Sequence, residues 1–280
     1  MAGQGLRGFP SVRQLFRPAL GNPRVAEPKM LVSLLQKMVS TAYLDACQRC
    51  NDWSGQQTAE LRPRALLDVG CADGAFLGKY LKHQPELFQG IEASPPLREK
   101  AEARGIKTFD VDLNGEWPFA NESFDVVHCS QVIEHLHNTR LFAQEIHRVL
   151  KPGGTALITS ENLTSFLNLG AMAFGYTPFT LMRCCGWYLG NPLGLHYQEH
   201  VSEDVPVTHP AFAGVTGHVR ALGVLQAKEL FQRIGFADVQ VSSYGLMPFP
   251  KWLGQPLEGL MPRRGHLLLI RATKAQSISK

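Results

Sequence analysis

Two acidic residues and two glycines lie at the end of one apolar segment of the chain. Asp68 ends the segment, and Gly70, Asp73 and Gly74 follow it. Glycine lets the backbone turn sharply and lets a ligand approach it closely. A dinucleotide favours the pattern G-x-G-x-x-G, but Ala72 stands at the second glycine position and Asp73 is negatively charged. The residues favour a cationic ligand, and a tight turn without a ligand is the alternative.

Polar side chains also stand at the ends of the next three apolar segments. Glu92 ends the second, Asp112 the third, and Ser130 with Gln131 the fourth. An acidic residue at the second of these positions can accept hydrogen bonds from both hydroxyls of a ribose. Because the carboxyl ends of parallel strands meet at one edge of a sheet, we expect these residues to form one extended ligand site.

Short apolar segments alternate with helical patterns, which indicates a parallel sheet covered on both faces. A helix is expected at 30–47, followed by a polar linker at 51–64. We predict strands at 65–69, 88–91, 107–111, 124–129, 155–159, 239–244 and 266–272, and further helices at 75–82, 96–104, 139–150 and 222–234.

Five segments resemble, in order, the motifs of class I S-adenosylmethionine-dependent methyltransferases. They are LLDVGCADGAF, GIEASPPLREKA, DVDLNGEWPFANESFDVV, SQVIEHL and VLKPGG. The resemblance is strongest to the small-molecule branch called methyltransferase type 11, spans about 62–160, and is weaker at 217–236. It implies an α/β, Rossmann-like, doubly wound sheet of seven strands, mostly parallel with an antiparallel last strand. Outside the resemblance we expect an N-terminal helical cap and a helical insertion.

We expect four regions, and the resemblance implies a set of cofactor-binding residues. The regions are a tail and helical cap at 1–61, the cofactor-binding core at 62–160, a substrate-covering insertion at 161–216 and the rest of the sheet at 217–280. Asp68 and Gly70 would lie at the amino-acid end of S-adenosylmethionine, and Glu92 at its ribose. The full set expected to bind the cofactor is Asp68, Gly70, Cys71, Gly74, Glu92, Ala93, Asp112, Leu113, Ser130 and Gln131.

Three residues are candidates for catalysis. His135 follows the fourth strand, where it can serve as a general base or only cap the next helix. His218 precedes the last long helix and could deprotonate a hydroxyl, while Arg220 could pair with an acidic group of the substrate. We expect no metal, because Gln131 stands where the metal-dependent 2′-O-methyltransferases and quinone O-methyltransferases carry a glutamate.

The predicted function is transfer of a methyl group to a small molecule or a lipid- or sugar-linked intermediate, most simply at an oxygen. The alternatives are an enzyme resembling RNA 2′-O-methyltransferases and a non-catalytic partner subunit that binds the cofactor. A net charge of +4 without a dense basic cluster argues against nucleic acid. Six scattered cysteines fit a reducing, cytoplasmic setting.

A long uncharged stretch follows the fifth predicted strand. Residues 162–182 carry no charge, but several polar residues, glycines and a proline interrupt them. We therefore expect a substrate-facing insertion that can touch a membrane surface through 161–190, and an amphiphilic small-molecule substrate. The arginine-containing N-terminus, before Glu27, is expected to be a tail or a flap over the site.

Overall fold

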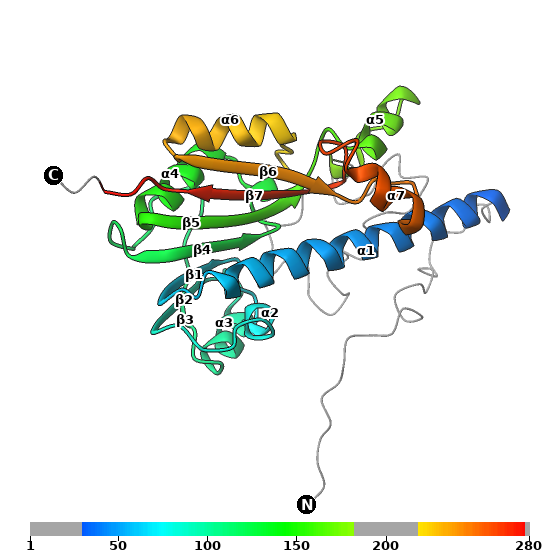
Figure 1. Cartoon of the computed structure of the whole chain (residues 1–280). Helices are drawn as coiled ribbons and strands as arrows, with labels where there is room; N and C mark the ends of the chain where they lie inside the picture. Colours follow the sequence, from blue (N-terminus) through cyan, green and yellow to red (C-terminus); the bar gives the residue numbers. More distant parts are fainter. Residues whose placement is uncertain (1–29, 182–217, 278–280) are drawn as a thin grey trace, which may run out of the picture.

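A seven-stranded sheet forms the centre of the molecule in a computed structural model, which describes residues 30–181 and 218–277 (Figure 1). The strand order is β3-β2-β1-β4-β5-β7-β6. β7 runs antiparallel to both of its neighbours, and the other neighbouring pairs are parallel. The predicted fold class is confirmed. The strands are β1 (Ala65–Val69), β2 (Leu87–Ile91), β3 (Lys107–Phe109), β4 (Phe124–Ser130), β5 (Leu150–Glu161), β6 (Asp238–Tyr244) and β7 (Leu267–Thr273).

The central strands carry apolar side chains on both faces of the sheet, and helices cover both faces. Along β1, Leu67 and Val69 join one core cluster while Leu66 joins another. The first cluster is closed by α4 (Thr139–Val149) and α6 (Val224–Ile234). The opposite face is covered by α1 (Met30–Glu60), α2 (Ala75–Gly78) and α3 (Pro95–Glu102). Successive side chains of a strand point to opposite faces, so apolar residues along the central strands need a layer of helices on each face of the sheet.

The linker expected at 51–64 is wrong for most of its length. Helix α1 continues without a break to Glu60 and runs along the sheet (Figure 1). Its polar residues there are satisfied internally, since the Ser54 hydroxyl contacts His128 of β4 and the Thr58 hydroxyl donates to the Ser54 carbonyl. The polar composition of this segment predicted a linker, but its buried polar residues have hydrogen-bond partners and the segment is helical.

The helix expected at 75–82 is also wrong in its length. Helix α2 is a single turn, Ala75–Gly78, and its first backbone N–H donates to the Asp73 carboxylate. Such a short helix has little dipole to offer a ligand. The loop before it, rather than the helix, must therefore supply the contacts to a ligand.

Three helical elements lie beyond the carboxyl edge of the sheet, two of them within the predicted helical insertion and one, α7 (Lys251–Glu258), absent from the prediction. Helix α5 (Phe166–Ala173) and the short η2 (Phe179–Leu181) follow β5, and α7 follows β6. β5 and β6 end level with each other, since Glu161 and Tyr244 both pair with Leu267. Residues 1–29 and 182–217, and with them much of the predicted tail and insertion, lie outside the described residues. Within the described part, no helix has the length and apolar character needed to cross a bilayer.

Candidate active site

The loop after β1 is held in a left-handed conformation at three positions. Gly70, Ala72 and Gly74 have φ values of 75°, 48° and 73°. The N–H groups of Gly70 and Cys71 both donate to the Ile91 carbonyl of β2, at 2.8 and 3.1 Å. Gly70 and Ala72 are exposed. The loop therefore presents its backbone to solvent at the carboxyl edge of the sheet, where a ligand can approach it.

We expect Gly70→Ala to destabilise the protein by about 1–3 kcal/mol. A left-handed conformation disfavours any residue with a Cβ, and a Cβ here would lie 2.6 Å from Cγ2 of Val132. Urea unfolding measures the change. The control is Gly78→Ala, whose Cβ would meet nothing within 4 Å. Equal stabilities of the two variants would contradict the prediction.

Glu92 is fixed beside this loop by two backbone groups. Its Oε2 accepts from the N–H of Ala72 at 3.0 Å, and its Oε1 accepts from the N–H of Ser94 at 2.8 Å. Each carboxylate oxygen can accept a second hydrogen bond, so the half-buried group retains the capacity to bind two hydroxyls. These two acceptor oxygens fit the two hydroxyls of the ribose of S-adenosylmethionine, and the role of Glu92 there stays a prediction.

Asp68 belongs to a buried row of three side chains that contact one another in turn. Its Oδ1 accepts from Nδ1 of His128 at 2.7 Å, and Nε2 of His128 lies 2.6 Å from the Ser54 hydroxyl. Ser54 is completely buried, so this row cannot attack a substrate. It joins α1, β4 and β1 beneath the loop instead. Sequence reasoning missed His128 and Ser54, because neither belongs to a local motif.

The other residues expected to bind the cofactor divide into three groups. Ala93 and Asp112 are exposed at the carboxyl edge, and Asp112 accepts from the backbone and side chain of Asn114. Ser130 and Gln131 are half-buried and both contact the Thr159 hydroxyl of β5, at 2.9 and 3.2 Å. The remaining three expected residues are Cys71 and Gly74, which are buried, and Leu113, which is half-buried against the core.

The side chain of Cys71 faces away from the proposed cofactor. It packs in a core cluster with Leu66 and Leu77, and burial raises the pKa of its thiol. Only the backbone of Cys71 can therefore contact a ligand at the loop surface. The expected cofactor role of this residue stays a prediction for its backbone.

His135 and His218 lie together although 83 positions separate them in the sequence. Their ring centroids are 4.8 Å apart, in an edge-to-face arrangement. Nδ1 of His218 donates to the Thr180 carbonyl at 2.8 Å and lies 3.5 Å from the Glu161 carboxylate. A neutral imidazole protonated at Nδ1 has its basic lone pair on Nε2. A carboxylate beside the ring stabilises the protonated form, so the arrangement is suited to accepting a proton.

Glu134 adds a second buried carboxyl group to this cluster. It is 1% exposed, its Oε2 accepts from the Ser160 hydroxyl at 3.0 Å, and its Oε1 has no hydrogen-bond partner in the described residues. Burial raises the pKa of Glu134 to about 7, with Glu161 raising it further and His218 and Ser160 opposing the shift. Glu134 and Glu161 escaped sequence analysis as site residues because only the fold brings them to His218.

We expect the raised pKa of Glu134 to make the protein less stable as the pH rises from about 5 to 7. The folded protein retains a proton that the unfolded chain releases above its ordinary pKa of 4.5. That stabilisation is complete below pH 4.5 and is lost as the pH passes 7, a change on the order of 3 kcal/mol. Urea unfolding of Glu134→Gln should lack this loss, while the exposed-residue control Glu99→Gln should keep it. If the free energies of unfolding of the wild type and Glu134→Gln changed in parallel with pH, the prediction would be refuted.

The segment from 218 to 222 is fixed to the site by its backbone. The N–H groups of Val219 and Arg220 donate to the Glu134 carbonyl, and Nε of Arg220 donates to the His137 carbonyl at 2.7 Å. Arg220 is exposed, and its contact with a substrate acid stays a prediction. Ligand atoms of Glu134, His135 and His218 lie within 4.8 Å of one another, a spacing that a shared divalent cation could use.

Comparisons with known proteins agree with this geometry. A sequence model described as "Methyltransferase domain" matches residues 39–241. Ajmaline N-methyltransferase of Rauvolfia serpentina is 33% identical over 109 residues, which are 36% of this chain and 38% of that protein. The mitochondrial ubiquinone biosynthesis O-methyltransferase of Rattus norvegicus is 34% identical over 111 residues, 35% of this chain and 31% of that protein. The matches thus span about a third of these relatives.

A solved structure shares the fold at low sequence identity. An O-methyltransferase family protein from Burkholderia thailandensis superposes with a TM-score of 0.51 and 14% identity. The alignment covers 88% of this chain and 60% of that chain. At this identity the likeness concerns the arrangement of strands and helices alone. It agrees with the seven-stranded sheet described above.

Proposed function

The chain belongs to the class I S-adenosylmethionine-dependent methyltransferases, and we propose that it methylates an oxygen of a small or lipid- or sugar-linked acceptor, with His218 as general base. The observation that carries this proposal is the pairing of His218 with His135 and Glu161 at the carboxyl edge. When bound, S-adenosylmethionine supplies an activated methyl group. The residues of the chain must then position the acceptor, exclude water and remove a proton where the acceptor is a hydroxyl.

Each side of the site has a distinct task in this proposal. Glu92 and the loop around Gly70 hold the ribose end of the cofactor. His218 takes the acceptor proton at Nε2, while Glu161 stabilises the imidazolium and the Thr180 carbonyl keeps Nδ1 protonated. His135 packs against the His218 ring and restricts its orientation. Methylation of a hydroxyl oxygen needs such a base, whereas methylation of a thiolate, a carboxylate or a carbanion does not.

The names of the relatives support methyl transfer but leave the acceptor atom open. The matched rat protein is named an O-methyltransferase and the matched Rauvolfia protein an N-methyltransferase. Our assignment of oxygen therefore rests on the histidine pair. The uncharged segment that precedes η2 supports an acceptor with an apolar part.

The linkage of the transferred methyl group tests the proposed acceptor atom. We would incubate the protein with S-adenosylmethionine labelled in the methyl group and a mixed extract of small metabolites and lipid-linked saccharides. A methyl ether, stable to mild alkali, is the expected product. Label on nitrogen would indicate an amine acceptor and would refute methylation of an oxygen. Label released as methanol by mild alkali would indicate a methyl ester, and it would refute the role of His218 as general base, because a carboxylate acceptor needs none. The matched control is Glu92→Ala, which should give no labelled product at low cofactor concentration.

A further inference from the structure

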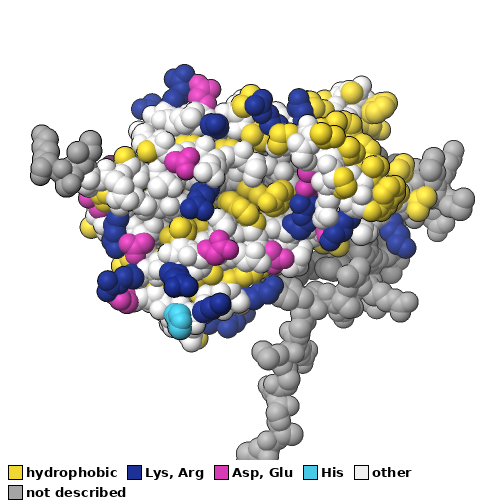
Figure 2. All heavy atoms as spheres, in the orientation of Figure 1, with side chains coloured by type: hydrophobic (Ala, Val, Ile, Leu, Met, Phe, Trp, Pro, Cys, Tyr) yellow, Lys and Arg dark blue, Asp and Glu magenta, His cyan; other side chains and the backbone are white. Residues whose placement is uncertain are grey.

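Large apolar side chains are exposed together on α5, α7 and the turns that follow them. Phe174, Leu260 and Trp252 are 82%, 78% and 76% exposed, although exposure of such residues in a group is unusual for a soluble surface. Figure 2 shows hydrophobic side chains gathered at this end of the molecule. We define the apolar edge surface as Phe166, Leu169, Met172, Phe174, Tyr176, Trp252, Leu260 and Met261.

The two halves of the apolar edge surface are joined rigidly. The rings of Phe166 and Phe249 lie 5.5 Å apart, and the Phe166 N–H donates to the Arg264 carbonyl at 2.9 Å. Beneath them, buried side chains from α1, α5 and the segment before α7 form one small core: Val39, Ala42, Leu167, Ala171, Phe179 and Met247. The exposed residues therefore lie on elements that are packed together by a buried core.

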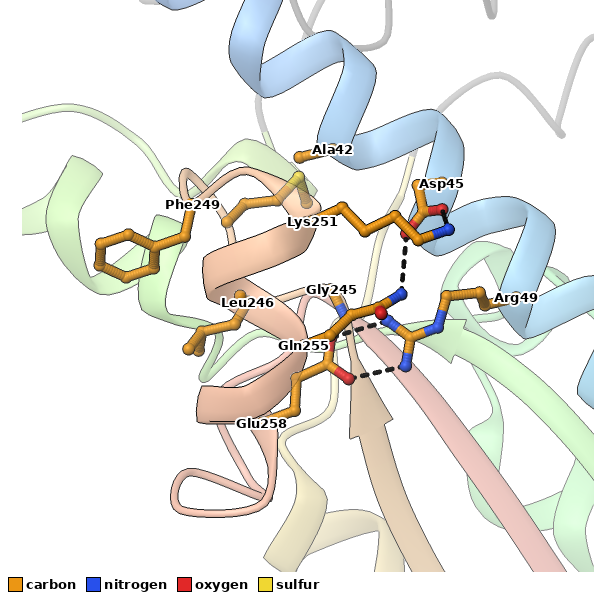
Figure 3. Close-up of a pocket in the computed structure, with 11 residues that line it drawn as sticks. Ala42, Asp45, Arg49, Gly245, Leu246, Phe249, Lys251, Gln255 and Glu258 are labelled. Atoms are coloured by element: carbon orange, nitrogen blue, oxygen red, sulfur yellow. Dashed lines mark hydrogen bonds and ion pairs between the residues drawn. The ribbon is translucent and has the colours of Figure 1, made fainter.

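The two segments that carry the apolar edge surface hold more cations than acids. Between residues 163 and 181 there is no charged residue, and between 245 and 265 the cations are Lys251, Arg263 and Arg264, of which Lys251 pairs with Asp45 of α1. The single acid in these two segments is Glu258, and Figure 3 shows it turned inward, where both carboxylate oxygens accept from Arg49. Arg263 is exposed. Exposed tryptophan and leucine beside an exposed arginine match the interface of an anionic bilayer.

The pairs shown in Figure 3 also argue against a small ligand between α1 and α7. Arg49 binds Glu258 at 2.9 and 2.7 Å, and Lys251 binds Asp45 at 2.7 Å. The pocket there is therefore lined by charges that satisfy one another. These ion pairs hold α7 against α1, and Trp252 of α7 remains exposed to solvent.

The apolar edge surface adjoins the site. α5 follows β5, whose last residue Glu161 contacts His218, and α7 follows β6, which ends level with β5. We propose that the apolar edge surface docks on an anionic lipid bilayer, so that the site receives a membrane-anchored acceptor. The identity of the acceptor rests on the function proposed above, whereas the docking itself does not.

Sedimentation with lipid vesicles tests the docking without any turnover. The full chain is mixed with vesicles of 30% phosphatidylglycerol and 70% phosphatidylcholine, and with vesicles of phosphatidylcholine alone. We expect binding to the anionic vesicles and at least fivefold weaker binding to the neutral ones. Phe174→Ser, Trp252→Ser and Leu260→Ser together should lower the partition coefficient at least tenfold. Arg263→Glu alone should lower it about fivefold or more on anionic vesicles.

Two controls keep the result interpretable. Leu87→Ser removes an apolar side chain that is 38% exposed at the first residue of β2, on the opposite edge, and should change vesicle binding less than twofold. Affinity for S-adenosylmethionine checks that each variant is folded, and Arg263→Glu serves if the triple variant is not. Vesicle binding that is absent, or unchanged in the variants, would overturn the proposal. So would a dimer in solution that the triple variant converts to a monomer, since a second copy would then occupy this surface.

Discussion

Glu92→Ala is expected to weaken binding of S-adenosylmethionine by about 30- to 1,000-fold. Two charge-assisted hydrogen bonds to the ribose would be lost, worth roughly 2–4 kcal/mol together. The loss also removes the acceptor of the Ala72 and Ser94 N–H groups, which Glu92 now holds at 3.0 and 2.8 Å. The loop around Gly70 would then be less well ordered for the ligand. Titration calorimetry with the cofactor and with its demethylated product gives both affinities.

Matched measurements separate the ribose contact from a general loss of charge or of folding. Glu86→Ala removes a glutamate that pairs with Arg64 on the surface, and it should leave the affinity within twofold. NAD should not bind wild-type protein comparably. Unchanged cofactor affinity in Glu92→Ala would rule out the ribose assignment.

His218→Ala is expected to lower kcat by about 10²- to 10⁴-fold, the usual contribution of a general base. Cofactor affinity should stay within about twofold, because in the proposed mechanism His218 contacts the acceptor and not the cofactor. His135→Ala should cost less, since in the proposed mechanism His135 only orients the His218 ring. The exposed His137 provides a matched control, and His137→Ala should leave turnover unchanged.

Chelation separates the base from a metal-assisted mechanism. Removal of divalent cations with EDTA should leave wild-type turnover unchanged if His218 acts as a base. Loss of turnover that added Mg²⁺, Mn²⁺ or Zn²⁺ restores would instead assign Glu134, His135 and His218 to a shared cation. Near-normal turnover of both single histidine variants would mean that catalysis rests on positioning, and the acceptor would then need no protein base.

Much of the cofactor side follows from local sequence signals. Apolar segments and the glycines after the first of them predicted where β1, β2 and β4 end, because strand burial and left-handed turns restrict residue type at single positions. Glu92 was predicted at the end of β2, and the structure places it beside the loop of Gly70. Such features need only residues close in the sequence, so a single sequence carries them.

The acceptor side depends on contacts between distant segments. Glu134, Glu161 and His218 meet only when β5, the turn after β4 and the segment before α6 pack together. The length of α1 was likewise decided by tertiary contacts, because Ser54 becomes a good buried helical residue only when His128 is its partner. Local patterns were enough to predict the ends of β1 and β2 and the tight turn after β1, whereas β3 ends two residues earlier and β5 two residues later than expected. The fold alone decided which ionisable groups share a buried, low-dielectric environment, since burial and long-range pairing set their pKa values and no local pattern encodes either.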